Sequence, residues 1–173
     1  MEDHIRVPPN KFGEDIKASI LSELKSKYEG FIDKEIGVII DILDVGQVEE
    51  GVIIAGDGAA FYKIDFVSLV FRVDLQEILL GKIRDITDFG AFITMGPMEG
   101  MIHISQTMDD FVSFSKDKAL QGKQSKKVLK PADLVRARMI AISFKDPDNP
   151  KFGLTMRQAG LGKLDWIAED LKK

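Results

Sequence analysis

From residue 77 to residue 158 the chain is mostly a succession of short strand patterns, and this run of strands constrains the fold more than any other feature. Segments rich in β-branched and aromatic residues alternate with glycine, proline and aspartate, which favour turns. Five strands of this length with turn signals between them are typical of a small β-barrel. The expected strands are residues 77–87, 89–95, 101–104, 134–144 and 153–158.

Two segments interrupt the strands of this barrel. Residues 105–132 have no strong periodicity and contain a lysine-rich stretch, whereas residues 145–151, KDPDNPK, form a turn with two prolines. After the last strand, GKLDWIAEDLKK has the spacing of a short helix. The apolar positions of this helix are Leu164, Trp166, Ile167 and Leu171.

The chain before residue 76 mixes a helix with strands. IRVPP predicts a first strand that ends at two prolines, which cannot continue a ladder. A helix is expected over residues 14–29, because Glu14 and Asp15 favour its start and Gly30 its end. One stripe of this helix is apolar and consists of Ile16, Ile20, Leu21, Leu24 and Tyr28.

Three further strands follow this helix. The first covers residues 36–43, and the other two flank the turn Gly56-Asp57-Gly58. In the last strand the alternating apolar residues first occupy even-numbered positions and then odd-numbered positions. This change predicts a bulge or bend near residues 66–68. We therefore expect two domains: an α+β domain at 1–75, with an antiparallel sheet and one helix, and an all-β barrel at 76–173.

Composition restricts the possible classes of protein. Of the 173 residues 45% are hydrophobic, which is enough for a packed core, and no cysteine is present. Disulfides, thiol catalysis and cysteine-ligated zinc are thereby excluded. No apolar run approaches the roughly 18 residues that span a bilayer, and MEDHIRVPP lacks the apolar core of a signal peptide. We expect a cytoplasmic protein with no membrane partner.

Charge is unevenly distributed along the chain. The net charge is −4, and residues 1–115 hold 21 acidic and 10 basic residues. Residues 116–138 hold 8 basic and 2 acidic residues. A local basic stretch on an acidic protein can attract a polyanion to one face. A solvated lysine-rich loop is an equally good interpretation.

The stretch DFGAFITMGPMEGMIHIS, residues 88–105, contains three flat rings. Phe89 and Phe92 are three residues apart, so strand alternation would place them on opposite faces. A bulge at Gly90 would bring both rings to one face, with His103 beside them on the next strand. Exposed rings on a barrel stack with unpaired bases. The alternative is that both phenylalanines belong to the core and that His103 makes one hydrogen bond.

Basic residues on the expected strands are candidates for phosphate contacts. Sequence alone does not decide which of them face the same side as the rings. The candidates are Lys82, Arg84, Arg136, Arg138 and Lys151.

No catalytic motif is present. The two histidines, His4 and His103, lie in different domains, and neither a metalloprotease helix motif nor a phosphate-binding glycine loop occurs. Asp109 and Asp110 form a carboxylate pair, which we interpret as a solvated or structural pair, because nothing nearby completes a metal site. The sequence favours binding over catalysis, without metal or cofactor.

GKIRDITDFGAFITMGPMEGMIHIS resembles the RNA-binding OB-fold domain named after ribosomal protein S-one, in about half of the chain. The closing strands DLVRARMIAIS and FGLTMRQ match that family as well. The matching positions are Gly81, Phe89, Gly90, Ala91, Phe92, Gly100, His103 and Ser105. This resemblance implies a five-stranded OB-fold barrel whose RNA-binding face carries Phe89, Phe92 and His103. Lys151 corresponds loosely to the family's basic residue near the fifth strand.

Nearly the whole chain is similar to the larger stalk subunit of archaeal RNA polymerase, called E or E-prime, which has a counterpart in eukaryotic RNA polymerase II. Segments that carry the resemblance include RVPPNKFG, KYEGFIDKEIGVII, AGDGAAFYKIDFVSLVFR and LTMRQAGLGKLDWI. The first strand is shorter than usual in this family, and Val73 replaces a common linker proline.

The stalk resemblance implies a role for each domain. The N-terminal domain would be a truncated RNP-like domain that docks on the polymerase core, with Gly56, Asp57 and Gly58 at its tip. A tight hairpin without a docking role is the alternative for this turn. A smaller helical stalk protein, called F, would bind along both domains to form a heterodimer. Leu79, Leu80 and Trp166 are candidates for that contact or, alternatively, for packing within the chain.

Two hypotheses about function remain from the sequence. The first is a non-catalytic polymerase stalk subunit that also binds emerging single-stranded RNA. The second is a free-standing RNA-binding protein with an S-one-type barrel, acting in translation or RNA decay. The N-terminal domain favours the first hypothesis, because a free factor has no need of a docking sheet.

Overall fold

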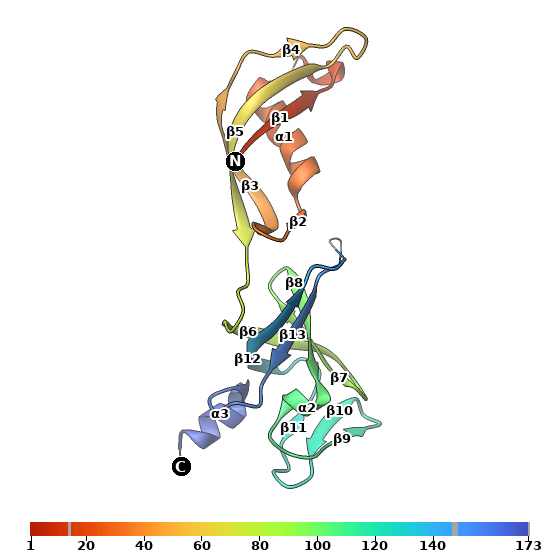
Figure 1. Ribbon diagram of the computed structural model, residues 1–173, viewed down its shortest axis with the longest axis vertical. Coiled ribbons are helices and arrows are strands. Elements are labelled where there is room, and N and C mark those ends of the chain that lie inside the picture. The colour runs from red at the N-terminus through yellow and green to blue at the C-terminus, as the bar shows by residue number, and fades with distance from the viewer. Residues whose placement is uncertain (14, 147–148, 173) are drawn as a thin grey trace. The chain divides into compact units, whose positions relative to one another are not determined.

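The computed structural model describes residues 1–13, 15–146 and 149–172. The chain folds into two compact units, Met1–Arg72 and Val73–Lys173, each with its own sheet (Figure 1). The expected domain ranges, 1–75 and 76–173, remain a prediction of where one domain ends and the next begins. The fold class is confirmed: a sheet-and-helix unit precedes an all-β barrel unit.

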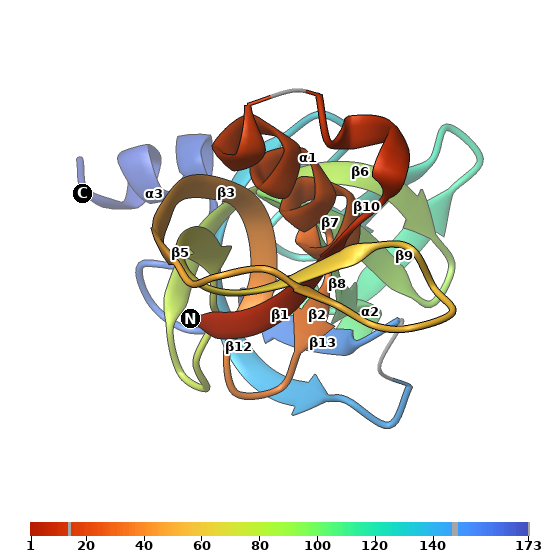
Figure 2. The same ribbon diagram turned by 90° about the horizontal axis from the view of Figure 1, so that it is seen from above.

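The first unit is an antiparallel sheet with a helix on one face. The sheet order is β1-β5-β3-β2, and β4 pairs with the outer part of β5. Its elements are β1 (Glu2–Val7), η1 (Pro9–Lys11), α1 (Ile16–Tyr28), β2 (Ile32–Asp33), β3 (Gly37–Val48), β4 (Val52–Ile53) and β5 (Ala60–Phe71). Figure 2 shows α1 alongside the sheet. The helix buries Ile20 and Leu24 in a core with Ile39, Ile42 and Ile64 from the strands.

Helix α1 begins and ends close to where the sequence predicts. The carboxylate of Asp15, the N-cap, accepts a hydrogen bond from the backbone N–H of Lys17 at 3.3 Å, and Glu14 lies outside the described residues. Gly30 follows the helix with φ of +78°, a conformation that favours glycine. Of the predicted stripe, Ile16 is exposed at the first turn.

Strand β3 is longer than predicted and irregular. Its pairing with β5 shifts register three times, and each shift inserts one extra residue into β3. The backbone N–H of Ile42 and that of Val45 bond to the preceding Asp41 and Asp44 side chains, at 2.7 and 2.8 Å. These bulges give β3 a core position at about every third residue instead of every second.

The predicted bulge near residues 66–68 of β5 is wrong in its location. A register shift does occur opposite Val67 and Ser68, but the extra residue is Leu43 of β3. Strand β5 keeps its alternation, with Ile64 and Phe66 buried and Val67 exposed. The apolar phase change therefore marks a second, solvent-facing apolar side of the sheet.

The second unit is a closed five-stranded barrel. Its sheet order is β13-β8-β7-β6-β12-β14, where β14 is the short strand Gly162–Lys163, and pairing of β12 with β13 closes the ring. The barrel strands are β6 (Ile78–Thr87), β7 (Gly90–Met95), β8 (Met98–His103), β12 (Leu134–Ser143) and β13 (Lys151–Thr155). All pairs are antiparallel except β8 with β13. The five predicted strands are confirmed, with small differences in their bounds.

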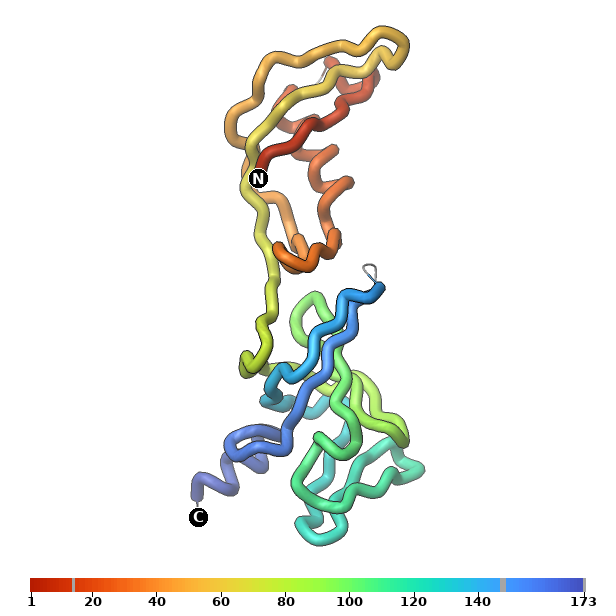
Figure 3. Tube along the Cα trace, in the orientation of Figure 1, coloured from red at the N-terminus to blue at the C-terminus, as the bar shows by residue number. Residues whose placement is uncertain are grey.

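The long insertion is structured, which the sequence did not predict. It contains α2 (Ile104–Thr107) and a separate three-stranded sheet of β9 (Val112–Ser115), β10 (Ala119–Gly122) and β11 (Val128–Leu129). Figure 3 follows the chain from the barrel through these strands and back to β12. Leu120 and Leu129 are fully buried, so the insertion has an apolar anchor. The proline turn at 145–151 includes residues 147–148, which lie outside the described residues.

The C-terminal segment forms β14 (Gly162–Lys163) and the predicted helix, α3 (Leu164–Asp170). Trp166 is buried, with 8% of its surface exposed, and Lys127 Nζ lies 5.5 Å from the centre of its ring. Leu171 follows the helix and is exposed. Trp166 therefore packs within the unit, which was the alternative to a contact with another subunit.

Candidate nucleic-acid interface

The register of the barrel strands brings the predicted ring residues to one face. Phe92 of β7 is paired with Asp85 of β6 and with Met101 of β8. Gly90, two residues earlier in β7, is paired with His103. Because paired residues point to the same side of a sheet, Phe92 and His103 share the outer side of the barrel, on adjacent strands.

Phe89 reaches the same side from the turn before β7. The rings of Phe89 and Phe92 lie 6.0 Å apart at an interplanar angle of 90°, an edge-to-face contact, and Phe89 is 48% exposed. The Phe89 carbonyl accepts a hydrogen bond from the N–H of Ile104 at 2.9 Å, which fixes its backbone. We call the outer side of β6, β7 and β8 that carries Phe89, Phe92 and His103 the ring face.

The predicted bulge at Gly90 is wrong, although its expected consequence is observed. The ladder between β7 and β8 runs without a shift from Gly90 onward, and the bulge in this region lies in β6, between Ile83 and Asp85. Phe89 precedes the strand, so the alternation of strand residues does not apply to it. The two rings meet because the turn folds Phe89 back over the strand.

Gly90 is required for a different reason. A Cβ at this position would lie 2.3 Å from the carbonyl oxygen of Ile102 and 3.1 Å from the Cα of His103. Both atoms belong to the backbone of β8, which approaches β7 closely here. Only glycine permits this approach, and it leaves no side chain opposite His103.

His103 is exposed at the end of β8 and caps the short helix α2. Its Nδ1 accepts a hydrogen bond from the backbone N–H of Ser105 at 3.3 Å and lies 2.8 Å from the Ser105 hydroxyl. Since Nδ1 acts as an acceptor, the neutral ring carries its proton on Nε2. His103 thus presents a donor and a flat ring beside Phe92.

Lys82 and Lys151 adjoin the ring face. Lys82 is paired with Thr94, the outward residue that follows Phe92 along β7, and it is exposed. Gly153 of β13 is paired with Met101, which is itself paired with Phe92. Lys151 precedes Gly153 by two residues and therefore lies on the same side of the barrel as Phe92. Both lysines therefore lie on the same outer side of the barrel as the rings.

The three other predicted arginines differ in their surroundings. Arg84 forms an ion pair with Glu99. Arg136 is paired with Leu80, beyond Lys82, and its Nη1 lies 3.4 Å from the Gly160 carbonyl oxygen. Arg138 is paired with Ile78, farther along β6, and its buried Nε has no hydrogen-bond partner among the described residues.

Lys118 is a basic residue near the ring face that sequence reasoning did not single out. Its ammonium lies 2.9 Å from the carboxylate of Asp85, the residue paired with Phe92. The hydrogen bond from Lys118 is the largest cause that lowers the pKa of Asp85. The only signal in the sequence was the lysine-rich composition of residues 116–138.

The two units match two known domain families, in the expected order. Residues 2–58 match the SHS2 domain found in the N terminus of Rpb7p/Rpc25p/MJ0397, and residues 72–142 match the S1 RNA binding domain. The chain is 37% identical over 170 residues to DNA-directed RNA polymerase subunit Rpo7 of Saccharolobus solfataricus, covering 97% of this chain and 94% of that protein.

This chain belongs to the Rpo7 family of DNA-directed RNA polymerase subunits.

Other relatives are likewise subunits of DNA-directed RNA polymerases. The Rpo7 subunit of Sulfolobus acidocaldarius is 35% identical over 98% of this chain and 93% of its own length. DNA-directed RNA polymerase III subunit RPC8 of Bos taurus is 33% identical over 96 residues, which is 56% of this chain and 47% of that protein. The predicted resemblance is confirmed, and the match along the whole chain favours the Rpo7 family over a free-standing S1-type factor.

The turn expected at the docking tip is a preorganised hairpin loop. Gly56 and Gly58 have φ of +98° and +70°, so both positions favour glycine. The guanidinium of Arg6 holds the Asp57 carboxylate with two hydrogen bonds, at 2.6 and 2.9 Å. These hydrogen bonds lower the pKa of Asp57 and raise that of Arg6. Three apolar residues before the turn, Val52, Ile53 and Ile54, are exposed.

Of the residues expected to contact a second subunit, Leu80 is 65% exposed, Leu79 is half-buried and Trp166 is buried. Another exposed apolar surface lies on the sheet of the first unit. Val67 and Leu69 point away from the buried side of β5, and Leu43 is exposed on β3. This surface was not singled out from the sequence.

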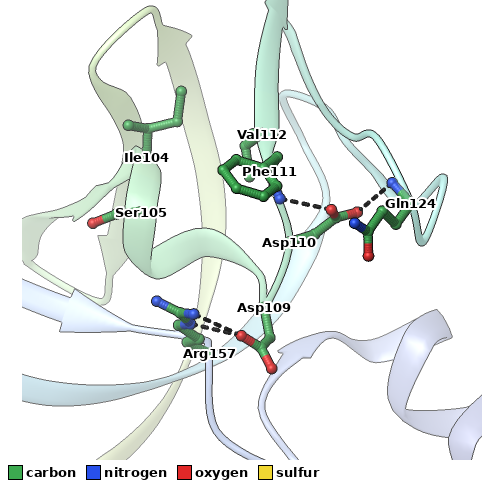
Figure 4. A pocket seen from close by; sticks show the side chains of 8 residues that line it. All are labelled: Ile104, Ser105, Asp109, Asp110, Phe111, Val112, Gln124 and Arg157. Carbon is green, nitrogen blue, oxygen red and sulfur yellow. Dashed lines mark hydrogen bonds and ion pairs between the residues drawn. The ribbon is translucent and has the colours of Figure 1, made fainter.

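A cavity of about 480 Å³ opens beside the start of α2 (Figure 4). It lies between α2 and the insertion sheet, and Ser105, the hydrogen-bond partner of His103, is one of its lining residues. Asp109 lines it and forms an ion pair with Arg157 at 2.7 Å. Of the pair interpreted as solvated or structural, Asp109 is exposed, whereas Asp110 accepts hydrogen bonds from the backbone N–H groups of Gln124 and Ser125.

Within residues 1–13, 15–146 and 149–172, no group of three or more histidine, aspartate or glutamate side chains is arranged to hold a metal ion. In the same part of the chain, no helix has the length and apolar character needed to cross a membrane.

Proposed function

We propose that this chain is a non-catalytic stalk subunit of a DNA-directed RNA polymerase whose barrel binds emerging single-stranded RNA on the ring face. The observation that carries the RNA-binding part is the edge-to-face pair of the exposed Phe89 and the half-buried Phe92, adjacent to His103. Unpaired bases stack on such rings without sequence preference. The S1 RNA binding domain match and the Rpo7 relatives support both parts of the proposal.

Phosphates of the bound strand would contact the lysines around the ring face. Lys82 and Lys151 lie on the same outer side of the barrel as the rings, and Lys118 is paired with Asp85, the residue opposite Phe92. Arg136 would contact a phosphate only where a longer strand extends past Lys82 toward Leu80. Each phosphate contact releases counterions, so binding would weaken as salt concentration rises.

The first unit would attach the chain to the rest of the enzyme in the cytoplasm. The turn Gly56-Asp57-Gly58, held by Arg6 and preceded by exposed apolar residues, would dock on the polymerase core. The apolar surface around Val67 would contribute to binding the smaller helical stalk protein. Nucleotidyl transfer would then belong to the polymerase core, and this chain would need no cofactor.

Substitution of a ring tests RNA binding against a closely matched control. Phe89 and Phe31 are both 48% exposed, and each makes an edge-to-face contact with a second ring at 6.0 Å. Phe31 lies in the other unit. We expect Phe89→Ala to raise the Kd for a single-stranded RNA roughly 5- to 150-fold, from the loss of about 1–3 kcal/mol of stacking. Phe31→Ala is expected to leave the Kd unchanged, as measured by fluorescence anisotropy.

Phe92→Ala and His103→Ala extend this test to the other two rings. Each is expected to weaken RNA binding while leaving polymerase assembly intact, because both residues lie on the outer side of the barrel. If the Kd is unchanged across all three substitutions, the rings have only a packing role and the RNA-binding proposal is wrong.

The assembly part of the proposal is tested by purification from the source cells. A tagged copy of the chain is expected to co-purify with polymerase subunits and with a small helical partner. Migration away from both would instead indicate a free-standing RNA-binding protein.

A further inference from the structure

The cavity beside the ring face has the size and lining of a binding site. Its volume of about 480 Å³ lies within the range of roughly 300–1,000 Å³ that is usual for small-molecule pockets. Its walls come from α2 and the barrel on one side and from the insertion on the other (Figure 4). The chemistry of the cavity is set by Ser105, Asp109, Asp110, Phe111, Gln124 and Arg157.

Phe111 presents an exposed ring at this cavity on a fixed backbone. It is 75% exposed, the largest exposed fraction of any phenylalanine in the described chain. Its N–H donates to Asp110 Oδ1 at 2.6 Å, and its carbonyl accepts from the N–H of Lys123 at 2.9 Å. A large apolar ring exposed on a rigid main chain offers a stacking surface that needs little ordering on binding.

Asp110 ties the two edges of the insertion together behind this ring. Its Oδ2 accepts hydrogen bonds from the N–H of Gln124, the N–H of Ser125 and the Ser125 hydroxyl, at 2.8–2.9 Å. These bonds, the backbone bond from Ser125 first, lower the pKa of Asp110. Both carboxylate oxygens of Asp110 thus accept hydrogen bonds within the insertion. These bonds fix the position of the segment that carries Phe111 relative to the segment that carries Gln124.

The charges that line the cavity favour a neutral ligand. The guanidinium of Arg157 contacts Asp109 Oδ1 through Nε at 2.9 Å and through Nη2 at 2.7 Å, so its charge is balanced. The second carboxylate, Asp110, leaves the lining with an excess of negative charge. A phosphate would be repelled, whereas a nucleobase offers a flat face for Phe111 and polar edges for the side chains of Gln124 and Ser105.

The cavity continues directly from the ring face. Ile104 lines it and donates its N–H to the carbonyl of Phe89, and Ser105 lines it and bonds to His103. A strand that stacks on Phe89, Phe92 and His103 therefore leaves the ring face next to the mouth of the cavity.

We propose that this cavity holds one unpaired base of the bound RNA strand, stacked on Phe111, so that the insertion forms a second base-binding subsite. This inference rests on the proposed RNA binding at the ring face, because the same strand would occupy both places. In this arrangement the subsite lengthens the RNA footprint of the barrel beyond its strands.

The test compares Phe111→Ala with Phe114→Ala. Phe114 lies on β9 of the same insertion and is 42% exposed, but it does not line the cavity. The full chain is titrated with a single-stranded RNA of about 12 nucleotides and with one of about four, near the lower limit of a barrel's site size. We expect Phe111→Ala to raise the Kd of the longer RNA about tenfold, with little effect on the shorter one. Phe114→Ala is expected to leave both unchanged.

Salt dependence separates a base from a phosphate in the cavity. Stacking releases no counterions, so Phe111→Ala is expected to leave the slope of log Kd against log salt concentration unchanged. Lys82→Ala is expected to reduce that slope by the amount that corresponds to about one phosphate contact. A changed slope for Phe111→Ala, or equal Kd values for Phe111→Ala and Phe114→Ala with the longer RNA, would overturn the subsite. Phe92→Ala reports separately on the ring face: if it weakens both RNAs, the proposed function stands whatever happens at Phe111.

Discussion

The close approach of β7 to β8 at Gly90 supports a quantitative prediction about the barrel. In Gly90→Ala the new Cβ would lie 2.3 Å from the carbonyl oxygen of Ile102. That oxygen belongs to the backbone of the neighbouring strand, so the overlap is relieved only if the two strands separate. We expect the free energy of unfolding to fall by about 2–3 kcal/mol, the upper part of the range for overpacked positions.

Gly100→Ala is the matched control for this prediction, on the adjacent strand. Its new Cβ would lie 2.4 Å from Leu154 Cδ1 and 3.0 Å from Met95 Cε, with the nearest backbone atom, the oxygen of Phe152, at 3.2 Å. The two closest atoms are ends of flexible side chains that can rotate. The expected loss is therefore smaller, about 1 kcal/mol.

Urea unfolding followed by tryptophan fluorescence measures both losses. The chain has a single tryptophan, Trp166, which is buried in the barrel unit, so the signal reports that unit alone. Because Gly90 is paired with His103, Gly90→Ala is also expected to weaken RNA binding at equal folded fraction, unlike Gly100→Ala. Equal losses of stability for the two variants would refute the argument that the β7–β8 spacing is fixed by backbone contact.

Two further predictions concern carboxylates. Partial burial raises the pKa of Asp3, but hydrogen bonds from Lys27 and Tyr28, both at 2.5 Å, outweigh it and lower the pKa below 3.8. This stabilisation is present above the unfolded pKa and is lost as pH falls through the folded pKa, so Asp3→Asn should flatten the acid limb of the unfolding curve below about pH 4, measured by circular dichroism. Asp110→Ala removes four hydrogen bonds, so the amide protons of Gln124 and Ser125 should exchange with solvent faster, while those of β12 stay unchanged.

The barrel strands were predictable because they are rich in β-branched residues, and the first two are followed by Asp88 and Gly96, residue types that favour turns. The side of the barrel that carries His103 also followed from the sequence, since it depends only on pairing between neighbouring strands. The long strand β3 was predicted too short. Its bulges place core residues about three apart and put Asp44 and Gly46 inside the strand, and both residue types are rare in regular strands.

The insertion was missed for a different reason. Its strands have only two to four residues and include serine, glutamine and glycine, so no period emerges. Tertiary contacts stabilise these strands: Leu120 and Leu129 are buried, and Asp110 accepts hydrogen bonds from backbone N–H groups across the loop. The exposed ring of Phe111 was missed as well. In a segment without periodicity, the sequence does not indicate which side chains are buried and which are exposed.

The ring face shows how a correct conclusion can rest on the wrong mechanism. Strand alternation separates residues 89 and 92, and a bulge at Gly90 is one way to reunite them, but Phe89 lies in a turn to which alternation does not apply. Its backbone is held instead by the N–H of Ile104, at the start of the helix that His103 caps. The positions of Phe89 and His103 therefore depend on the same helix start, and a change that unwinds α2 would disturb both rings together while leaving Phe92, which the strand itself holds, in place.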